Sequence, residues 1–332
     1  MSNDSSPHAR AALHGLGTAL PEQILLSSDI ETRLGLSSGW IERHTGIRAR
    51  RVAAPGELPS HLAAQAITRA CADADITPDH LGAVIHGAAS TDQLIPCTAA
   101  LIARKLDIAG RTCLDVDATC LSFLAALDLA ALWVGSGAHK YVAVASAEVA
   151  SLGVDWTEPA SAVLMGDAAA AVIVGPARGT SRLYPALLRT FPAGSSLAEL
   201  PGYGVRHSPS DPSTTAHHNL FHMQGPKLFR FATEHATQAV SDHLTAIAWR
   251  QDEVALVPHQ ASAHALRSAA RRCGFRPEQT LENIAERGNC LAASIPLLLA
   301  EACADGRILP GHRVLLAGTA AGVTVGAMAL VR

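Results

Sequence analysis

The sequence is poor in charge and has none of the long apolar runs that mark membrane proteins. Only 17% of its 332 residues are charged, and a net charge of −3 gives no general attraction for nucleic acid or anionic membranes. No apolar run reaches the roughly 18 residues that a membrane-spanning helix needs. The N-terminus, residues 1–7, is polar and unlike a signal peptide. We therefore expect a cytoplasmic protein with neither nucleic acid nor a membrane as partner.

The cysteines and glycines lack the spacings that bind metals or dinucleotides. Seven cysteines, an odd number without CxxC spacing, indicate neither a disulfide framework nor a zinc site. The segment 15–17, Gly-Leu-Gly, lacks the third glycine and the later acidic residue of a dinucleotide-binding loop. His218 and His222 are spaced like a metal-binding pair, but no carboxylate accompanies them in the usual arrangement. We therefore expect no metal site.

Hydrophobic residues make up 48% of the chain and fall into two alternating patterns. Short apolar runs without in/out alternation predict strands buried on both faces, and alanine-rich stretches of helical period predict helices. The predicted strands are 81–86, 141–145, 254–258 and 314–317, and the predicted helices are 60–74, 123–134, 263–273 and 294–304. Strands that alternate with helices favour an α/β architecture, with central sheets covered by helices.

The two halves of the chain repeat one pattern. An acidic residue, an apolar run and a histidine in 79–86 are echoed in 252–259. Cys120 follows the first of these histidines by 34 residues, and Asn289 follows the second by 30. After each comes an alanine-rich helix, a turn with glycine and a strand, and a strand of small residues closes each half.

Duplicated halves are expected to pack their sheets face to face, with equivalent strand tips meeting near a pseudo-twofold axis. We place the N-terminal half at 10–178, a connection rich in Gly, Pro and Ser at 179–216, and the C-terminal half at 217–332. This arrangement would bring Cys120 of the first half to His259 and Asn289 of the second.

A thiol, an imidazole and an amide stand where a short apolar run ends and a helix begins. The positive end of a helix dipole favours the thiolate of Cys120. His259 can donate a hydrogen bond to a developing negative oxygen or shuttle a proton. Asn289 does not titrate, but its amide can donate to an enolate oxygen. Together these three residues supply the groups that acyl-thioester chemistry needs.

Each of these residues also has a plain structural interpretation. A lone cysteine is more often buried packing, and a Gly-Asn pair is more often a turn. His259 is one of sixteen histidines, and its place in Val-Pro-His-Gln-Ala distinguishes it. The segment 318–322, Gly-Thr-Ala-Ala-Gly, is either a tight turn or a loop whose N–H groups form half of an oxyanion hole, with the N–H of Cys120 as the other half.

The chain resembles β-ketoacyl-acyl-carrier-protein synthase III and its relatives in the thiolase superfamily. The matching motifs are 16–22, Trp40-Ile41, 45–47, Cys120 with Phe123, Gly166-Asp167, Met223 with Gly225, 257–261, Gly288-Asn289, and Thr324 with Gly326. This resemblance, from about Leu13 to Arg332, implies a thiolase-like five-layered αβαβα fold of two similar halves, usually a homodimer. It also implies a catalytic triad of Cys120, His259 and Asn289.

By that resemblance, Cys120 takes an acyl group from an acyl-CoA, with oxyanion support from the N–H groups of Cys120 and Ala321. A malonyl thioester then loses carbon dioxide, His259 and Asn289 stabilise the enolate, and the carbanion attacks the acyl-cysteine. The product is a β-ketoacyl thioester. The resemblance implies no metal or redox cofactor, since CoA and phosphopantetheine thioesters are the substrates, and it implies an acyl carrier protein as partner.

Five further positions are implied in substrate binding. Trp40 corresponds to the residue that stacks on the CoA adenine, and Gly225 lies near the pantetheine. Ser262 replaces the asparagine that usually follows Val-Pro-His-Gln-Ala. Met165 is on the wall of the acyl pocket, and Ile95 falls where the partner subunit closes that pocket.

The chain departs from the family pattern at several positions. Leu121 and Ser122 follow the nucleophile where the family usually has Ala or Ser and then Gly. His264 stands in place of an arginine that helps the acidic carrier protein dock, and Arg230 and Arg267 are candidates to compensate. Ile95 in place of an aromatic residue favours longer or branched primers.

Other activities fit less well. An acyltransferase to a hydroxyl or amine typically has Asp in place of Asn289, and a degradative thiolase would carry a second cysteine in 318–322. A catalytically dead partner subunit would have lost the nucleophile or the histidine, and a papain-like hydrolase has a different neighbourhood around its cysteine. Residues 39–47 also resemble biotin-pathway enzymes with a dicarboxylic (pimeloyl) primer. No arginine could be assigned to a distal carboxylate, so this remains the alternative.

Overall fold

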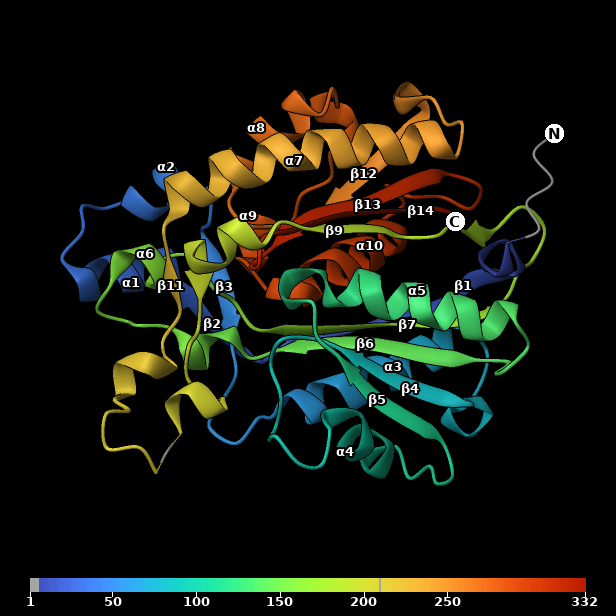
Figure 1. Ribbon diagram of the computed structural model, residues 1–332, viewed down its shortest axis with the longest axis horizontal. Helices are drawn as coiled ribbons and strands as arrows, with labels where there is room; N and C mark the ends of the chain where they lie inside the picture. The colour runs from blue at the N-terminus through green and yellow to red at the C-terminus, as the bar shows by residue number, and fades with distance from the viewer. Residues whose placement is uncertain (1–5, 209) are drawn as a thin grey trace.

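The computed structural model describes residues 6–208 and 210–332, and two mixed β-sheets form its centre (Figure 1). In the first sheet the order is β1 (Ala11–Ala19), β7 (Ala168–Pro176), β6 (Val142–Glu148), β4 (Ala83–Gly87) and β5 (Thr112–Val116). Strand β4 is parallel to β5 and β6, whereas β7 is antiparallel to both β6 and β1. Every residue of β4 and β6 is buried, as expected for strands covered on both faces.

The second sheet repeats the order and directions of β4, β6, β7 and β1 of the first. Its strands are β12 (Val254–Pro258), β13 (Arg313–Ala320), β14 (Thr324–Val331) and β8 (Arg182–Leu183), with β9 (Leu187–Thr190) also paired to β14. Strand β12 is parallel to β13, and β14 is antiparallel to β13, β8 and β9. Strands β8 and β9 thus take the place that β1 has in the first sheet.

This pairing changes one sequence-based boundary. The segment 179–216, interpreted as a connection, contains β8 and β9 and so begins the second half rather than only joining it. The two strands have two and four residues, too short for an apolar period to stand out from the glycine- and proline-rich sequence around them.

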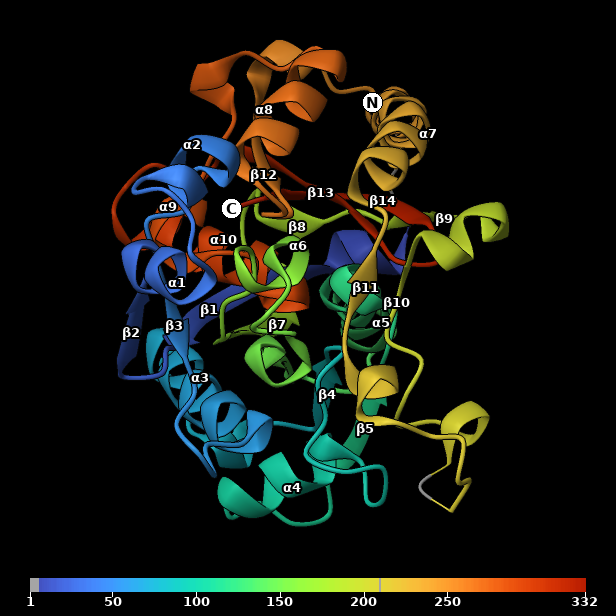
Figure 2. The same cartoon turned by 90° about the vertical axis from the view of Figure 1, so that its left-hand side faces the viewer.

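Helices form three layers around the two sheets (Figures 1 and 2). Helices α3 (Pro59–Asp73) and α4 (Thr98–Lys105) cover the outer face of the first sheet. Helices α5 (Ser122–Gly135) and α10 (Ser294–Ala304) lie between the sheets, and α7 (Gly225–Ala246) and α8 (Ala263–Arg272) cover the second sheet. The five-layered αβαβα arrangement predicted from the sequence is therefore confirmed.

The two central helices are apolar on nearly all sides because both sheets contact them. The acidic residue within α5, Asp128, is satisfied locally. Its Oδ1 lies 2.8 Å from Nε2 of His8 and accepts a 2.7 Å bond from the N–H of Ala186. The polar group therefore ties the N-terminus and the start of the second half to the middle layer.

The remaining elements cluster near the strand tips that carry the candidate site. They are α1 (Ser27–Leu34), α2 (Trp40–Thr45), β2 (Gln23–Leu26), β3 (Ala49–Val52), α6 (Pro159–Ala162), β10 (Ala198–Glu199), β11 (His222–Met223) and α9 (Ile284–Arg287). All eight elements predicted from the sequence have the predicted type, and β12 and α10 match their predicted bounds. Within the described ranges, no helix is both long enough and apolar enough to cross a membrane.

Candidate active site

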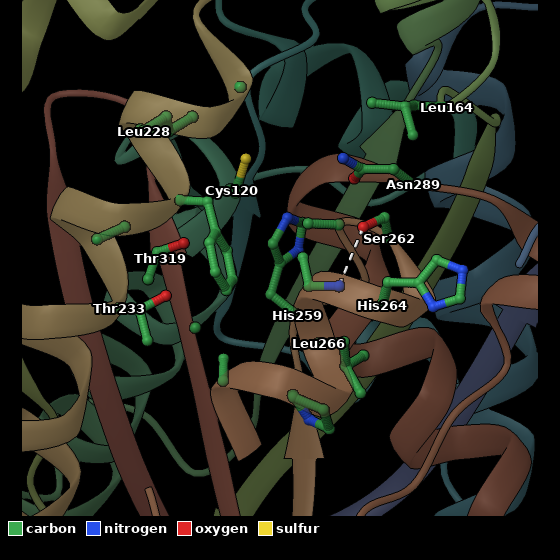
Figure 3. Close-up of a pocket in the computed structure, with 18 of the residues that line it drawn as sticks. Cys120, Leu164, Leu228, Thr233, His259, Ser262, His264, Leu266, Asn289 and Thr319 are labelled. Carbon is green, nitrogen blue, oxygen red and sulfur yellow. Dashed lines mark hydrogen bonds between the residues drawn. The ribbon is translucent and has the colours of Figure 1, made fainter. Parts of the chain in front are cut away.

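A cavity of about 840 Å³ lies beneath α7 and α8 and reaches the strand tips where the two halves meet. Cys120, His259 and Asn289 all line it (Figure 3). The structure therefore brings together the three residues that the sequence singled out, although 139 positions of the chain separate Cys120 from His259.

Cys120 is held in a tight turn before α5. The turn is a short 3-10 helix, Thr119–Leu121, in which Thr119 has a φ of 50°. Ser122 fixes the turn, because its Oγ donates to the carbonyl of Thr119 at 2.6 Å and accepts from the N–H of Ala118 at 2.9 Å. The serine that replaces the family's glycine thus rigidifies the backbone that carries the thiol.

Burial raises the pKa of the Cys120 thiol to about 12, and the charge of Glu148 acts in the same direction. The backbone N–H groups of Cys120 and Ala321 oppose this rise. The helix start was expected to favour the thiolate, but the loss of solvation outweighs it, so the resting residue is a neutral thiol. The same two N–H groups are the pair predicted for the oxyanion hole, and both lower the pKa of the thiol.

His259 follows the last residue of β12 and is 8% exposed. Its backbone N–H donates to the carbonyl of Ala317 at 2.9 Å, which fixes the ring relative to β13. Burial lowers the pKa of His259 to about 4, and the backbone of Leu291 only partly opposes this. Its Nδ1 is buried and has no hydrogen-bond partner in the described part of the chain. The imidazole is therefore neutral near pH 7.

Asn289 is held by both halves of the molecule. Its N–H donates to the carbonyl of Leu164 at 2.9 Å, and its carbonyl accepts from the N–H of Gly166 at 3.0 Å. Asn289 Oδ1 accepts from the N–H of Leu291 at 3.0 Å. This bond orients the amide, and Nδ2 has no hydrogen-bond partner in residues 6–208 and 210–332. Nδ2 is thus left as a donor for a ligand.

Glu148 is a further residue of the site that the sequence reasoning missed. It ends β6 and is fully buried, and its carboxylate accepts N–H bonds of 2.9 Å from both Ala89 and Ser90. A third bond comes from Ala292, in the turn after Asn289. Burial raises the pKa of Glu148 to about 7, although these donors oppose the rise. The signal in the sequence was a single acidic residue at the end of an otherwise uncharged strand.

The loop 318–322 lies against the segments that carry Cys120 and His259. The carbonyl of Ala321 accepts a bond of 3.4 Å from Thr119 Oγ1, which places this loop beside the turn of Cys120. A Cβ added at Gly318 would lie 2.7 Å from the Cβ of His259 and 3.1 Å from Leu121 Cδ2. The small residues of the loop are therefore needed for its close approach to the other two segments.

Four of the five predicted substrate-binding residues line the cavity: Trp40, Met165, Gly225 and Ser262. The indole of Trp40 stacks on the ring of His44 at 4.0 Å, so one of its faces is already covered. Ser262 caps α8, because its Oγ accepts the N–H of Ala265 (Figure 3). Ile95 does not line the cavity, since it is 86% exposed on the loop before α4.

The residues considered for docking of a carrier protein differ in whether their side chains already contact other residues. His264 Nε2 contacts the carbonyl of Arg43 at 2.8 Å, at the mouth of the cavity. Arg267 pairs with Glu282 through two nitrogens, so its charge is already balanced. Arg230 is exposed and makes no ion pair with any described residue. Of the two candidates named from the sequence, Arg230 is therefore the free cation.

No group of three or more His, Cys, Asp or Glu residues with metal-binding geometry occurs within the described ranges. The residues of the cavity are a thiol, imidazoles, an amide, hydroxyls and apolar groups. This composition suits thioester chemistry.

Comparison with known proteins identifies the family of this chain. The family described as 3-oxoacyl-[acyl-carrier-protein (ACP)] synthase III matches residues 114–190, and its C-terminal counterpart matches 244–332. The chain is 36% identical over 323 residues to a β-ketoacyl-[acyl-carrier-protein] synthase III of Nitratidesulfovibrio vulgaris, covering 96% of this chain and 98% of the relative.

Two solved structures of synthases from the same family have a similar fold. The 3-oxoacyl-[acyl-carrier-protein] synthase III of Aquifex aeolicus has a TM-score of 0.89 at 29% identity, over 97% of this chain and 100% of that one. The corresponding synthase of Thermus thermophilus has a TM-score of 0.87 at 32% identity, over 97% and 99%. The molecule is thus a condensing enzyme of the thiolase-like fold. The chain belongs to the β-ketoacyl-[acyl-carrier-protein] synthase III family.

Proposed function

We propose that the protein catalyses the decarboxylative Claisen condensation of an acyl-CoA primer with a malonyl thioester, through an acyl group on Cys120. The observation that carries this proposal is the single cavity lined by a thiol, a neutral imidazole and an amide donor. The backbone N–H groups of Cys120 and Ala321, which lower the pKa of the thiol, support it further. Together these groups serve both halves of such a reaction.

In the first half, the sulfur of Cys120 attacks the carbonyl carbon of the acyl-CoA and gives up its proton. The oxyanion that forms is stabilised by the N–H groups of Cys120 and Ala321, and CoA leaves as its thiol. Because burial raises the pKa of Cys120, the thiolate forms at the time of attack and is not present in the resting enzyme. A neutral thiol is oxidised less readily than a thiolate between turnovers.

In the second half, a malonyl thioester loses carbon dioxide, and the resulting enolate carbon attacks the acyl group on Cys120. A neutral His259 donates from one ring nitrogen to the enolate oxygen, and Asn289 Nδ2 donates to the same oxygen. The tetrahedral intermediate then expels the Cys120 sulfur, which recovers a proton. Both donors, the ring N–H of His259 and Nδ2 of Asn289, are uncharged. They stabilise the negative charge of the enolate by hydrogen bonds and do not form an ion pair with it.

The proposal is tested by intact-protein mass spectrometry after incubation with a panel of acyl-CoAs, with Cys120→Ala as control. We expect a gain of one acyl group in the wild type and none in the variant. Added malonyl thioester should then remove the acyl group with release of carbon dioxide. Removal only by an alcohol or an amine would establish an acyltransferase in its place.

We further propose that the enzyme acts as a homodimer with an acyl carrier protein as partner. The exposed side chains of Leu94 and Ile95 support the homodimer, since they are 77% and 86% exposed at adjacent positions. Apolar pairs of this kind are commonly covered by another protein surface. Light scattering of the wild type and of Ile95→Asp tests the dimer, and a monomeric wild type would refute it.

A further inference from the structure

An arginine is fully buried behind the wall of the cavity. Arg50 lies on β3, in the small β2–β3 sheet outside both central sheets, and it has no exposed surface. Burial lowers the pKa of Arg50 to about 10, and no carboxylate pairs with it in the described part of the chain. The side chain is therefore still a cation at neutral pH. No step of the proposed reaction uses it.

Packing alone does not account for an arginine at this position. Nε of Arg50 is buried and has no hydrogen-bond partner among residues 6–208 and 210–332. A buried cation without a counter-ion, and with one N–H group unsatisfied, lowers the stability of a fold. An apolar side chain of similar length, such as methionine, would fill the same space without this cost. What distinguishes the arginine from such a side chain is the pair of hydrogen bonds that its other two nitrogens make.

These hydrogen bonds join the start of α1 to the cavity wall. Nη1 of Arg50 donates to Oγ of Ser27 at 3.3 Å, and Nη2 donates to the carbonyl oxygen of Val163 at 2.8 Å. Ser27 is itself fixed, because its Oγ donates to the carbonyl of Ile47 at 2.6 Å and its N–H to that of Arg48 at 2.8 Å. Hydrogen bonds from a charged donor are stronger than those between neutral groups. Arg50 thus ties Val163 to a fixed support.

Val163 begins the segment that holds the backbone of Asn289. Residues 163–166 are here called the wall segment, and the first three of them line the cavity. The carbonyl of Leu164 accepts the N–H of Asn289 at 2.9 Å, and the two residues lie side by side in the cavity wall (Figure 3). The N–H of Gly166 donates to the carbonyl of Asn289 at 3.0 Å. A displacement of Val163 would therefore move the backbone of Asn289 with it.

The stem of Arg50 supports the same pairing from behind. A Cβ added at Gly166 would lie 3.1 Å from the Cβ of Arg50, and one added at Gly288 would lie 3.3 Å from it. Gly166 ends the wall segment, and Gly288 precedes Asn289 in the chain. Arg50 therefore lies close against both of the paired segments, while its guanidinium holds the first residue of the wall segment.

We propose that Arg50 is a positioning residue for the malonyl half of the reaction: by holding the carbonyl of Val163, it fixes the wall segment that places the amide of Asn289. This inference rests on the proposed function, because it concerns the step in which Nδ2 of Asn289 stabilises the enolate. Arg50 does not line the cavity, so it acts through Asn289 and not on the substrate. Displacement of a catalytic group by about 1 Å can slow a reaction about 100-fold.

The test compares two rates measured by intact-protein mass spectrometry. The first is the acylation of Cys120 by an acyl-CoA, and the second is the discharge of the acyl group by malonyl-CoA or malonyl-acyl carrier protein, whichever discharges the wild type faster. Arg50→Met should lower the discharge rate by about tenfold or more, while acylation changes by less than about threefold. Arg50→Lys keeps the charge and one donor, so it should recover part of the discharge rate.

Arg51→Met is the matched control on the same strand. Nη1 of Arg51 donates to the carbonyls of Pro21 and Glu22 and not to the wall segment. The control should therefore discharge the acyl group at the rate of the wild type, and a loss equal to that of Arg50→Met would overturn the inference.

A double-mutant cycle separates positioning from a general loss of structure. In the Asn289→Ala background the amide that Arg50 positions is absent, so Arg50→Met should change the discharge rate by less than about twofold. An additive loss, or an equal loss of acylation and discharge in the single variant, overturns the inference. If Arg50→Met does not fold, Arg50→Lys takes its place in the same cycle, and an additive loss again overturns it.

The failure of this inference differs from the failure of the proposed function. Discharge of Arg50→Met at the rate of the wild type overturns the inference and leaves the proposed function intact. A wild type that no acyl-CoA acylates on Cys120 refutes the proposed function, and the inference with it.

Discussion

Glu148 Oε1 lies 3.3 Å from the backbone nitrogen of Ala292, and this bond joins the end of β6 to the turn that follows Asn289. The same carboxylate holds the backbone after β4 through Ala89 and Ser90. One buried acid thus connects segments of both halves directly behind the thiol. Its effect on the raised pKa of Cys120 shows that it is electrostatically coupled to the site.

Glu148→Gln should remove a pH dependence of stability. Burial raises the pKa of Glu148 to about 7 from an ordinary value of 4.5. The folded state therefore keeps a proton that the unfolded state loses. The stability contributed by this group is full below about pH 4.5 and is lost as pH rises through about 7, by at most about 3 kcal/mol. Urea unfolding at pH 5 and at pH 8 should show this loss in the wild type and not in the variant; parallel pH dependences would contradict it.

The discharge of acyl-Cys120 by a malonyl thioester should depend on neutral His259. Since burial lowers the pKa of His259 to about 4 from 6.5, the discharge rate should be level from about pH 6 to 8 and fall as pH approaches 4. His259 also stabilises the fold above pH 6.5, and this contribution is lost as pH falls through 4. Rapid-quench mass spectrometry of the preformed acyl-enzyme measures the rate. A midpoint near 6.5 would show that the ring is not desolvated.

Asn289→Asp should slow the decarboxylation step without preventing the acylation of Cys120. The change removes the Nδ2 donor and places a negative charge beside the developing enolate. Decarboxylation should therefore slow by about 10²–10³-fold, while Cys120 still accepts an acyl group. Release of labelled carbon dioxide and intact mass measure the two steps. If both steps slow equally, Asn289 acts by holding the loop and not on the enolate.

Gly318→Ala should disturb the ring of His259. The added Cβ would lie 2.7 Å from the Cβ of His259, and β13 has no room to move between its neighbours. We expect a loss of about 1–3 kcal/mol in the free energy of unfolding, with slower malonyl-dependent discharge. Gly204→Ala is the matched control, because a Cβ there meets no atom within 4 Å. Equal melting temperatures for the two variants would contradict the prediction.

Much of this fold could be read from the sequence because its central elements are strongly patterned. Strand β12 and helix α10 match their predicted bounds, since each is a largely apolar segment that ends at polar or glycine-containing sequence. The repeat placed Cys120, His259 and Asn289 at equivalent strand tips, and the cavity contains all three. What identified these positions was their order and spacing, not any one residue type.

The remaining features depend on contacts between distant segments. The role of Glu148 depends on Ala89, Ser90 and Ala292, none of which is its neighbour in the sequence. The raised pKa of Cys120 follows from burial that helix polarity alone does not reveal. Part of the cavity wall is formed by alanines of α7 and α8, such as Ala236 and Ala269, which in sequence look like ordinary helix-forming residues.

The pairing of Met165 with Asn289 constrains how such a molecule can evolve. The backbone of Asn289 is shaped by the carbonyl of Leu164 and the N–H of Gly166, which belong to the other half of the duplication. Neither half can drift, or be exchanged for that of a relative, without changing the partner segment that positions this amide. At this position the two halves therefore form one structural unit.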